Sequence, residues 1–344
     1  MLTTLILGFF TVLFSYLSKF SNLKWGLKLS FLLIFCFLAL RFDFGNDYMY
    51  YYNNFQEISN ISSFNIVNYH VKGSEIGWLL LNVCFSSMGF FTMNAVLAAF
   101  ATYALYKFIK KYVSPQYYWF AVFLYVFQPS QMLILSSAAR QAVAVTLFLL
   151  AFDFIVEKKV VKYLLVILIA TLFHTSSIFL FPLIFFGFFN FQLKFRYIII
   201  ILFIFIFSVI NFQGFFQYID LITEQSGMYK TYVDETDVSY SELKFGTGFA
   251  LNLIIYFTFL FYSQNETDKR NRILFKIGIV SLLIIPLGLT IQLASRLNYY
   301  LFPMIMAIYP IVFRKMKIFM RFSYMVVIIL FTLYQFYYFF NSSV

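Results

Sequence analysis

Charged residues are scarce in this sequence: only 11% of its 344 residues are Asp, Glu, Lys or Arg, against about 25% in a soluble globular domain. Hydrophobic residues make up 62%, and a chain this apolar would expose large aggregating patches in water. The 25 Lys and Arg residues outnumber the 14 Asp and Glu residues, but they lie in short clusters between apolar runs, as in membrane proteins. The composition therefore excludes a soluble globular protein. It predicts that the chain lies in a lipid bilayer and that nucleic acid is not a partner.

Cysteine and histidine are also scarce. Cys36 and Cys84 lie in apolar runs and imply no disulfide framework. Two histidines without a Cys/His cluster give no metal-ligand spacing, so we predict no metal and no cofactor. The patterns GxxxxGK[ST] and GxSxG are absent, which argues against ATP hydrolysis and against a serine hydrolase. The first apolar run lacks a basic start and a small-residue cleavage site, so we interpret it as a spanning helix.

Long apolar runs fill most of the chain. A bilayer core needs about 20 mainly apolar residues per helix, and the runs predict an all-α, polytopic integral membrane protein with about 12 transmembrane helices. We expect a single transmembrane domain over residues 1–344. The predicted spans are 2–18, 25–41, 92–111, 117–134, 136–156, 160–174, 176–190, 196–212, 247–263, 273–292, 297–313 and 320–340.

The positions of Lys and Arg predict the orientation. One set of loops holds 19 of the 25 basic residues, and the positive-inside rule places these loops in the cytoplasm and both termini outside. Residues 76–90 are apolar enough to cross, but a crossing would turn the later basic loops outward, so we predict a re-entrant or interfacial helix there. Two sizeable outer loops, 42–75 and 213–246, hold ten of the 14 acidic residues. Chemistry is therefore expected at the outer face.

Polar and ionisable residues at membrane depth are costly and are functional candidates by default. Arg41 ends the second predicted span, and Gly45 and Asn46 after it suit a tight turn that would hold Asp43 and Asp47 near the guanidinium. Snorkelling of Arg41 to the interface is the structural alternative.

Two further arginines lie at the same outer boundary. Arg140 has no acidic residue within a helical turn, so its partner must come from another helix or from a ligand. A bound phosphate would suit a guanidinium, and a structural ion pair is the alternative. Arg296 precedes the span 297–313. If Arg41, Arg140 and Arg296 converge, they form a cationic pocket at the level of the outer headgroups, suited to a lipid phosphate or pyrophosphate.

The same outer zone offers candidates for acid–base chemistry. His174, between two predicted spans, could act as a general base or simply be hydrogen-bonded there; Asp47 and Glu75 are the alternative bases. Aromatic side chains, expected at any membrane interface, also stack on sugars. The candidates for sugar binding are Tyr48, Trp78, Gln141, Tyr299 and Tyr300.

Five short motifs in order give a resemblance to a known family. They are R-x-x-x-G-x-D-Y (Arg41 to Tyr48), E-x-G-W (Glu75 to Trp78), A-R-Q-A-V-A (Ala139 to Ala144), F-H-T-S-S-I (Phe173 to Ile178) and S-R-L-x-Y-Y-L (Ser295 to Leu301). Together they resemble the EpsG family of Wzy-like polysaccharide polymerases. The chain departs from the usual family pattern at Phe42 and Asn46, where Tyr and Thr are common.

The resemblance implies a glycosyltransferase in the bacterial inner membrane with its active site facing the periplasm. Such polymerases transfer a glycan chain from undecaprenyl pyrophosphate onto a lipid-linked repeat unit, which makes O antigen, capsule or exopolysaccharide. It also implies a chain-length regulator as a partner. The arginines could stabilise the leaving pyrophosphate, and loop 213–246, with Tyr229, Tyr232 and Tyr240, could cover the sugars as a lid. A flippase for the same lipid-linked oligosaccharide, a membrane O-acyltransferase of surface sugars and a glycan ligase are the alternatives.

Overall fold

The computed structural model describes residues 1–20, 24–59, 75–189, 247–290 and 296–342, together with scattered positions between 194 and 207. Every element in these ranges is a helix: 13 are α-helices and two are 3-10 helices. The all-α prediction is therefore confirmed. The chain divides into two compact units, residues 1–189 with 302–344 (the first unit) and residues 190–301 (the second unit). A single transmembrane domain over residues 1–344 stays a prediction.

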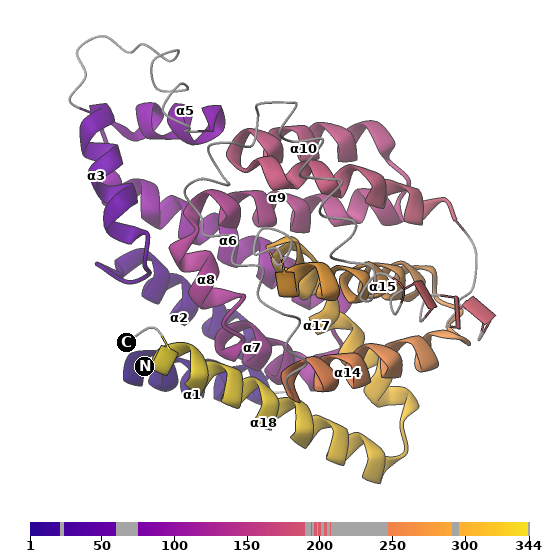
Figure 1. The fold of residues 1–344 in the computed structure, drawn as a ribbon. Coiled ribbons are helices and arrows are strands. Elements are labelled where there is room, and N and C mark those ends of the chain that lie inside the picture. Colours follow the sequence, from indigo (N-terminus) through magenta and orange to yellow (C-terminus); the bar gives the residue numbers. More distant parts are fainter. Residues whose placement is uncertain are drawn as a thin grey trace. The chain divides into compact units, whose positions relative to one another are not determined.

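The first unit is a bundle of helices that pack side by side. Helix α1 packs on α2, α2 on α6, α6 on α9, and α9 on α10, while α5 lies beside the end of α10 (Figure 1). The helices of this unit are α1 (Leu2–Leu17), α2 (Gly26–Leu40), α3 (Tyr48–Ser59), α5 (Ile76–Phe85), α6 (Phe90–Tyr112), η2 (Pro115–Tyr117), α7 (Tyr118–Phe127), α8 (Met132–Ser137), α9 (Ala139–Val156), α10 (Val160–Phe173), η3 (Thr175–Gly187), α18 (Ile318–Ser342) and most of α17 (Leu297–Lys315).

The second unit contains α14 (Thr247–Ser263), α15 (Lys269–Thr290) and the first residues of α17. A chain of hydrogen bonds joins these three helices. The Tyr256 hydroxyl bonds the Ser281 hydroxyl at 2.8 Å, and Ser281 Oγ donates to Asn298 Oδ1 at 2.9 Å. Tyr256 and Ser281 are both buried, so this chain supplies polar partners inside an apolar layer.

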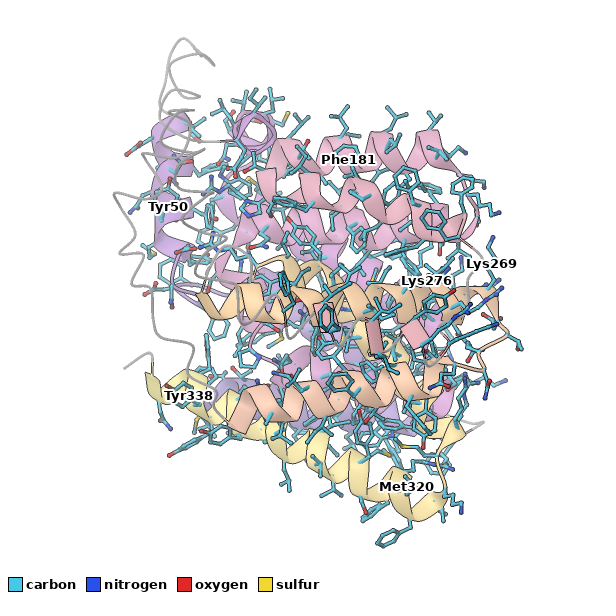
Figure 2. All side chains as sticks on the ribbon, turned by 45° about the vertical axis from the view of Figure 1, so that its right-hand side comes forward. Tyr50, Phe181, Lys269, Lys276, Met320 and Tyr338 are labelled. Carbon is cyan, nitrogen blue, oxygen red and sulfur yellow. The ribbon has the colours of Figure 1, made fainter. Side chains whose placement is uncertain are left out.

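Large apolar side chains project from the outside of the helices, as lipid contact requires. In Figure 2, Met320 and Tyr338 point outward from α18, and both side chains are more than half exposed. Only 17% of the most apolar stretch of α18 is buried. Among the described helices, α9 and α18 are long and apolar enough to cross a membrane, judged by length and composition. Six more apolar helices have 10–17 residues. The chain is an integral membrane protein, and the count of 12 spans stays a prediction.

Most predicted spans in the described ranges coincide with helices to within a few residues, but the predicted span 117–134 is not one continuous helix. Helix α7 ends at Phe127, and Gln128 is extended, with φ −79° and ψ 115°. Pro129 follows and disfavours the helical conformation at the residue before it. The chain restarts as the short helix α8 and breaks again at Ala138, with φ −89° and ψ 69°, before α9. This break places Arg140 at the second position of α9.

The structure also bears on the predictions for residues 42–90 and 176–190. The predicted loop 42–75 contains a helix, α3, and the predicted span 176–190 forms the 3-10 helix η3 with Pro182 inside it. Helix α5 has ten residues, which is about 15 Å of helix and half of a bilayer core; the re-entrant or interfacial placement of this segment stays a prediction. Residues 60–74, most of the span 196–212, and the loop 213–246 with its predicted lid lie outside the described residues.

Candidate functional site

One carboxylate joins two of the predicted site residues. Glu75 Oε2 forms an ion pair with Nη1 of Arg140, and Glu75 Oε1 lies 3.2 Å from Nδ1 of His174. The partners are 65 and 99 positions away from Glu75 in the sequence. The side chains are largely enclosed, with exposed fractions of 14% for Glu75 and His174 and 25% for Arg140. Glu75 is therefore the partner of Arg140, and it comes from another part of the chain.

Helix packing brings Glu75 and His174 together. Glu75 is the extended residue before α5, and His174 is the extended residue that ends α10. Gly77, in the first turn of α5, lies against the backbone of Leu172: a Cβ added at Gly77 would come within 2.7 Å of the Leu172 carbonyl oxygen. The absence of a side chain at position 77 therefore lets α5 approach the end of α10 closely enough for the contact.

An aromatic cluster supports the other side of the ion pair. The guanidinium of Arg140 lies 5.9 Å from the centroid of the Tyr51 ring, and its Nε donates to the Tyr51 hydroxyl at 3.5 Å. The Trp78 ring lies 5.0 Å from the Tyr51 ring, and both belong to a buried cluster with Tyr48 and Phe90. Cation–π contact and packing thus hold the Arg140 side chain against α3 and α5.

Arg41 has different neighbours from those that its motif suggested. Its Nη1 donates to the Ser136 carbonyl oxygen at 2.6 Å, and its Nη2 donates to Asn94 Oδ1 at 3.3 Å. Within the described ranges no ion pair joins Arg41 to Asp43 or Asp47. Both aspartates are exposed, so the prediction that the turn holds them near the guanidinium is wrong.

The tight turn itself is present. Gly45 has φ +107°, a conformation that favours glycine, and its carbonyl oxygen accepts the Tyr48 amide at 3.0 Å. The Asn46 amide donates to Ser137 Oγ at 3.1 Å, so the turn lies against the end of α8. It serves to dock the start of α3 beside α8.

Two members of the predicted cationic pocket, Arg41 and Arg140, lie beside α3, and the pocket itself stays a prediction. Arg41 lies 5.6 Å from the Tyr48 ring, and Arg140 contacts Tyr51, one helical turn further along α3. Both guanidinium groups therefore border the first turn of α3. Arg296, Tyr299 and Tyr300 belong to the second unit, and their part in the pocket stays a prediction.

The predicted sugar-binding residues of the first unit are enclosed by protein. Tyr48, Trp78 and Gln141 are each 2% exposed. The Tyr48 ring packs edge-on against the Phe90 ring, with centroids 5.5 Å apart, and it also lies beside the guanidinium of Arg41. Their assignment to sugar binding stays a prediction.

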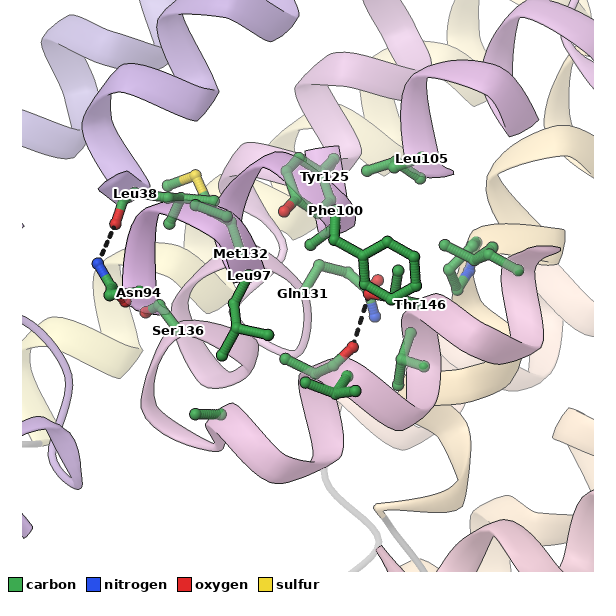
Figure 3. Close-up of a pocket in the computed structure, with 18 of the residues that line it drawn as sticks. Leu38, Asn94, Leu97, Phe100, Leu105, Tyr125, Gln131, Met132, Ser136 and Thr146 are labelled. Carbon is green, nitrogen blue, oxygen red and sulfur yellow. Dashed lines mark hydrogen bonds between the residues drawn. The ribbon is translucent and has the colours of Figure 1, made fainter. Parts of the chain in front are cut away.

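A cavity of about 70 Å³ runs from Arg41 into the bundle, between α2, α6, α7, α8 and α9. Figure 3 shows Asn94 and Ser136 at one end and Leu105 and Thr146 at the other. Its walls are mostly apolar, but Gln131 is fully buried beside it, and no hydrogen-bond partner among the described residues meets its Oε1. Ala139, Ala142 and Thr146 on α9 line the cavity, whereas Arg140 on the same helix contacts Glu75.

The electrostatics keep Glu75 ionised and orient His174. Burial raises the pKa of the Glu75 carboxyl, but the hydrogen bond from His174 and the positive charge of Arg140 outweigh it and hold the pKa below its ordinary value of 4.5. An ionised carboxylate only accepts hydrogen bonds, so Nδ1 of His174 is the donor. Nε2 of His174 is buried and meets no hydrogen-bond partner among the described residues. In the neutral ring this nitrogen is a free acceptor, which is the form of a general base.

Three contributors were not among the predicted site residues: Tyr51, Asn94 and Ser136. Asn94 could have been found as an isolated polar residue in the apolar run 92–111, and Tyr51 by its position three residues after Tyr48. Ser136 contributes a backbone carbonyl, for which side-chain chemistry gives no signal. No group of three His, Cys, Asp or Glu side chains in the described part of the chain could hold a metal ion.

Comparison with known proteins identifies a family. The model of the EpsG family matches residues 24–344, a range that includes all five motifs. No curated protein and no solved structure matches the chain.

Proposed function

The chain belongs to the EpsG family, and we propose that it is a Wzy-type polymerase. It transfers an undecaprenyl-pyrophosphate-linked glycan chain onto a lipid-linked repeat unit at the periplasmic face of the bacterial inner membrane. Family membership suggests a polysaccharide polymerase-like role and a lipid-linked oligosaccharide as the substrate. The observation that carries the proposal further is that Glu75 joins a guanidinium, which can hold a phosphate, to an imidazole, which can accept a proton.

The reaction needs both groups. The hydroxyl oxygen of the acceptor sugar attacks the anomeric carbon of the donor, and the bond from that carbon to the phosphate oxygen breaks. Undecaprenyl pyrophosphate leaves with the electron pair, and the hydroxyl proton passes to Nε2 of His174. Glu75 fixes the imidazole through Nδ1 and stabilises the imidazolium that forms, as the carboxylate does in catalytic triads. His174 is thus the base, and Glu75 is its positioning partner.

The arginines stabilise the leaving group. Fixed cationic donors aimed at developing charge supply a large share of the stabilisation of many transition states. Arg140 and Arg41 border the first turn of α3 and can face a pyrophosphate there, and Arg296 would complete the set. Asp47, exposed at the start of α3, remains the alternative base.

The cavity beside Arg41 suits the carrier lipid next to its phosphate. Leu97, Leu105 and Leu149 line it, and a prenyl chain gains from contact with such walls. We therefore place the first isoprene unit of the carrier in this cavity, with the pyrophosphate above it at the arginines.

The test is the glycan ladder of cells that lack the gene, complemented with wild type, Arg140→Ala or His174→Ala. Glu57→Gln serves as a control, because Glu57 is an exposed acidic residue of α3. We expect the null strain to make only single repeat units, wild type and Glu57→Gln to restore the ladder, and the two site variants to stop at one unit at normal protein levels. Absence of any surface repeat unit in the null strain, with lipid-linked units held on the cytoplasmic side, would instead identify a flippase.

A further inference from the structure

Arg140 is already paired in this structure, with a carboxylate of the same chain. Its Nη1 contacts Glu75, and its Nε contacts the hydroxyl of Tyr51. A phosphate group approaching Arg140 would meet the Glu75 carboxylate, which has the same sign of charge and already occupies Nη1. Binding of an anion at Arg140 and the ion pair with Glu75 are therefore in competition.

Glu75 has a second partner to which it can turn. Its other carboxylate oxygen lies 3.2 Å from Nδ1 of His174, so a Glu75 that leaves Arg140 keeps a hydrogen bond. A buried carboxylate with no partner would be costly, and the hydrogen bond from His174 reduces that cost. The guanidinium also keeps a support, because the Tyr51 ring lies 5.9 Å from it independently of the carboxylate.

We propose that the pyrophosphate of the lipid-linked donor displaces Glu75 from Arg140, and that Glu75 then serves His174 alone. This inference rests on the proposed function, and it identifies the exchange of partners as the step that couples donor binding to the base. While Arg140 neutralises the carboxylate, the imidazolium form of His174 gains little from Glu75. Once pyrophosphate occupies Arg140, the full carboxylate charge stabilises the imidazolium that receives the acceptor proton.

The exchange makes an unusual prediction for binding. Glu75→Gln removes the competing charge and keeps the size of the side chain, so Arg140 is free for an anion at all times. The apparent affinity of a ligand rises when the competent state no longer has to be populated at a cost. We expect Glu75→Gln to bind pyrophosphate about tenfold more tightly than wild type, although the same variant loses polymerisation.

The experiment measures binding of inorganic pyrophosphate by isothermal titration calorimetry, with the full-length protein in lipid nanodiscs. The variants are wild type, Glu75→Gln, Arg140→Gln and the exposed control Glu57→Gln, each checked for thermal unfolding. We expect tighter binding for Glu75→Gln, no binding for Arg140→Gln, and unchanged binding for Glu57→Gln. Equal or weaker binding by a folded Glu75→Gln variant overturns the exchange, as does an equal gain in Glu57→Gln, which would indicate a general charge effect.

A second variant keeps the test valid if Glu75→Gln does not fold. His174→Phe keeps a ring but removes the second partner of Glu75, so displacement of Glu75 becomes costlier and pyrophosphate binds more weakly than to wild type. In the Glu75→Gln background the same substitution should have no further effect, which is the coupling that a double-mutant cycle measures. Unchanged or tighter binding of pyrophosphate by a folded His174→Phe variant would contradict the exchange, as would equal weakening in both backgrounds where Glu75→Gln does fold.

Failure of this inference is distinguishable from failure of the proposed function. A null strain that lacks the ladder, together with a Glu75→Gln variant that binds pyrophosphate no better, leaves a polymerase without the exchange. A null strain with a normal ladder, together with the binding changes above, leaves an anion-binding site with the exchange but refutes the polymerase.

Discussion

Gly77 is the residue whose substitution most directly tests how the site is assembled. In Gly77→Ala the new Cβ would lie 2.7 Å from the Leu172 carbonyl oxygen, whereas ordinary contact begins at 3.4 Å. The start of α5 must therefore move by about 0.7 Å, since neither partner atom belongs to a flexible side chain. Overpacking of this kind costs about 1–3 kcal/mol.

The displacement should separate Glu75 from His174. Their contact is already 3.2 Å long, and a further shift of about 0.7 Å would take it beyond hydrogen-bond range. A hydrogen bond to a charged group contributes about 1.5–3 kcal/mol, which corresponds to about a 10- to 100-fold lower rate if the bond orients the base. We therefore expect Gly77→Ala to leave mainly single repeat units on the glycan ladder.

Helix propensity makes the opposite prediction for the same substitution. Alanine favours a helix over glycine by about 1 kcal/mol, so α5 alone would become more stable. The measurements are the ladder in cells and the thermal unfolding temperature of the purified protein, with Cys84→Ala as the control because Cys84 is exposed on the same helix. A Gly77→Ala variant that is as active and at least as stable as wild type would refute the close-contact account, whereas a larger loss in Gly77→Val would support it.

Four further outcomes follow from the described contacts. Arg140→Lys should lose the ladder at normal protein level, because an ammonium cannot bridge Glu75 and Tyr51 as a planar guanidinium does. The folded-state pKa of Glu75 is depressed, so the stability that its carboxylate contributes is present above about pH 4.5 and is lost as pH falls through the lower folded value. Unfolding temperatures measured between pH 3 and pH 7 should therefore fall less at acid pH in Glu75→Gln than in wild type. Gly45→Ala should cost about 1–3 kcal/mol of unfolding free energy, measured by chemical denaturation, because φ is +107° and Ser137 leaves no room for a Cβ. Asn94→Ala should cost about 1–3 kcal/mol on the same assay, because its side chain bonds Arg41 and the Leu38 carbonyl oxygen.

The sequence is a good guide to the helices because their cause is local. An apolar run of sufficient length predicts α1, α2, α6 and α9 within a few residues. The break between α7 and α8 is also local, since Pro129 marks it. The sequence predicts a loop at α3 because its tyrosines and asparagines give no apolar run. The helix is held by packing of Tyr48, Tyr51 and Phe55 against α5 and α6.

The sequence predicts which residue types belong to the site, but it does not predict which of them contact one another. A lone Arg140 in an apolar helix predicted a partner elsewhere, and that prediction was correct. Its identity could not be read from the sequence, because Glu75 lies 65 positions away and the contact depends on how α5 packs against α10. For Arg41 the nearest acidic residues along the chain were the wrong choice, since the turn at Gly45 exposes Asp43 and Asp47 and leaves Arg41 to a backbone carbonyl and an amide.

The motif E-x-G-W shows why such a short pattern can be specific. Glu75 provides the charge, Gly77 provides the room for α5 to reach Leu172, and Trp78 packs against Tyr51, which in turn supports Arg140. Each residue acts on a different neighbour, so no substitution at one position can compensate for loss at another. Trp78→Phe would keep a ring in the buried cluster and should therefore preserve more of the ladder than Trp78→Ala, because the role assigned to Trp78 is to support the Arg140 side chain through Tyr51. Equal loss in both variants would instead favour a direct contact between the indole and a sugar.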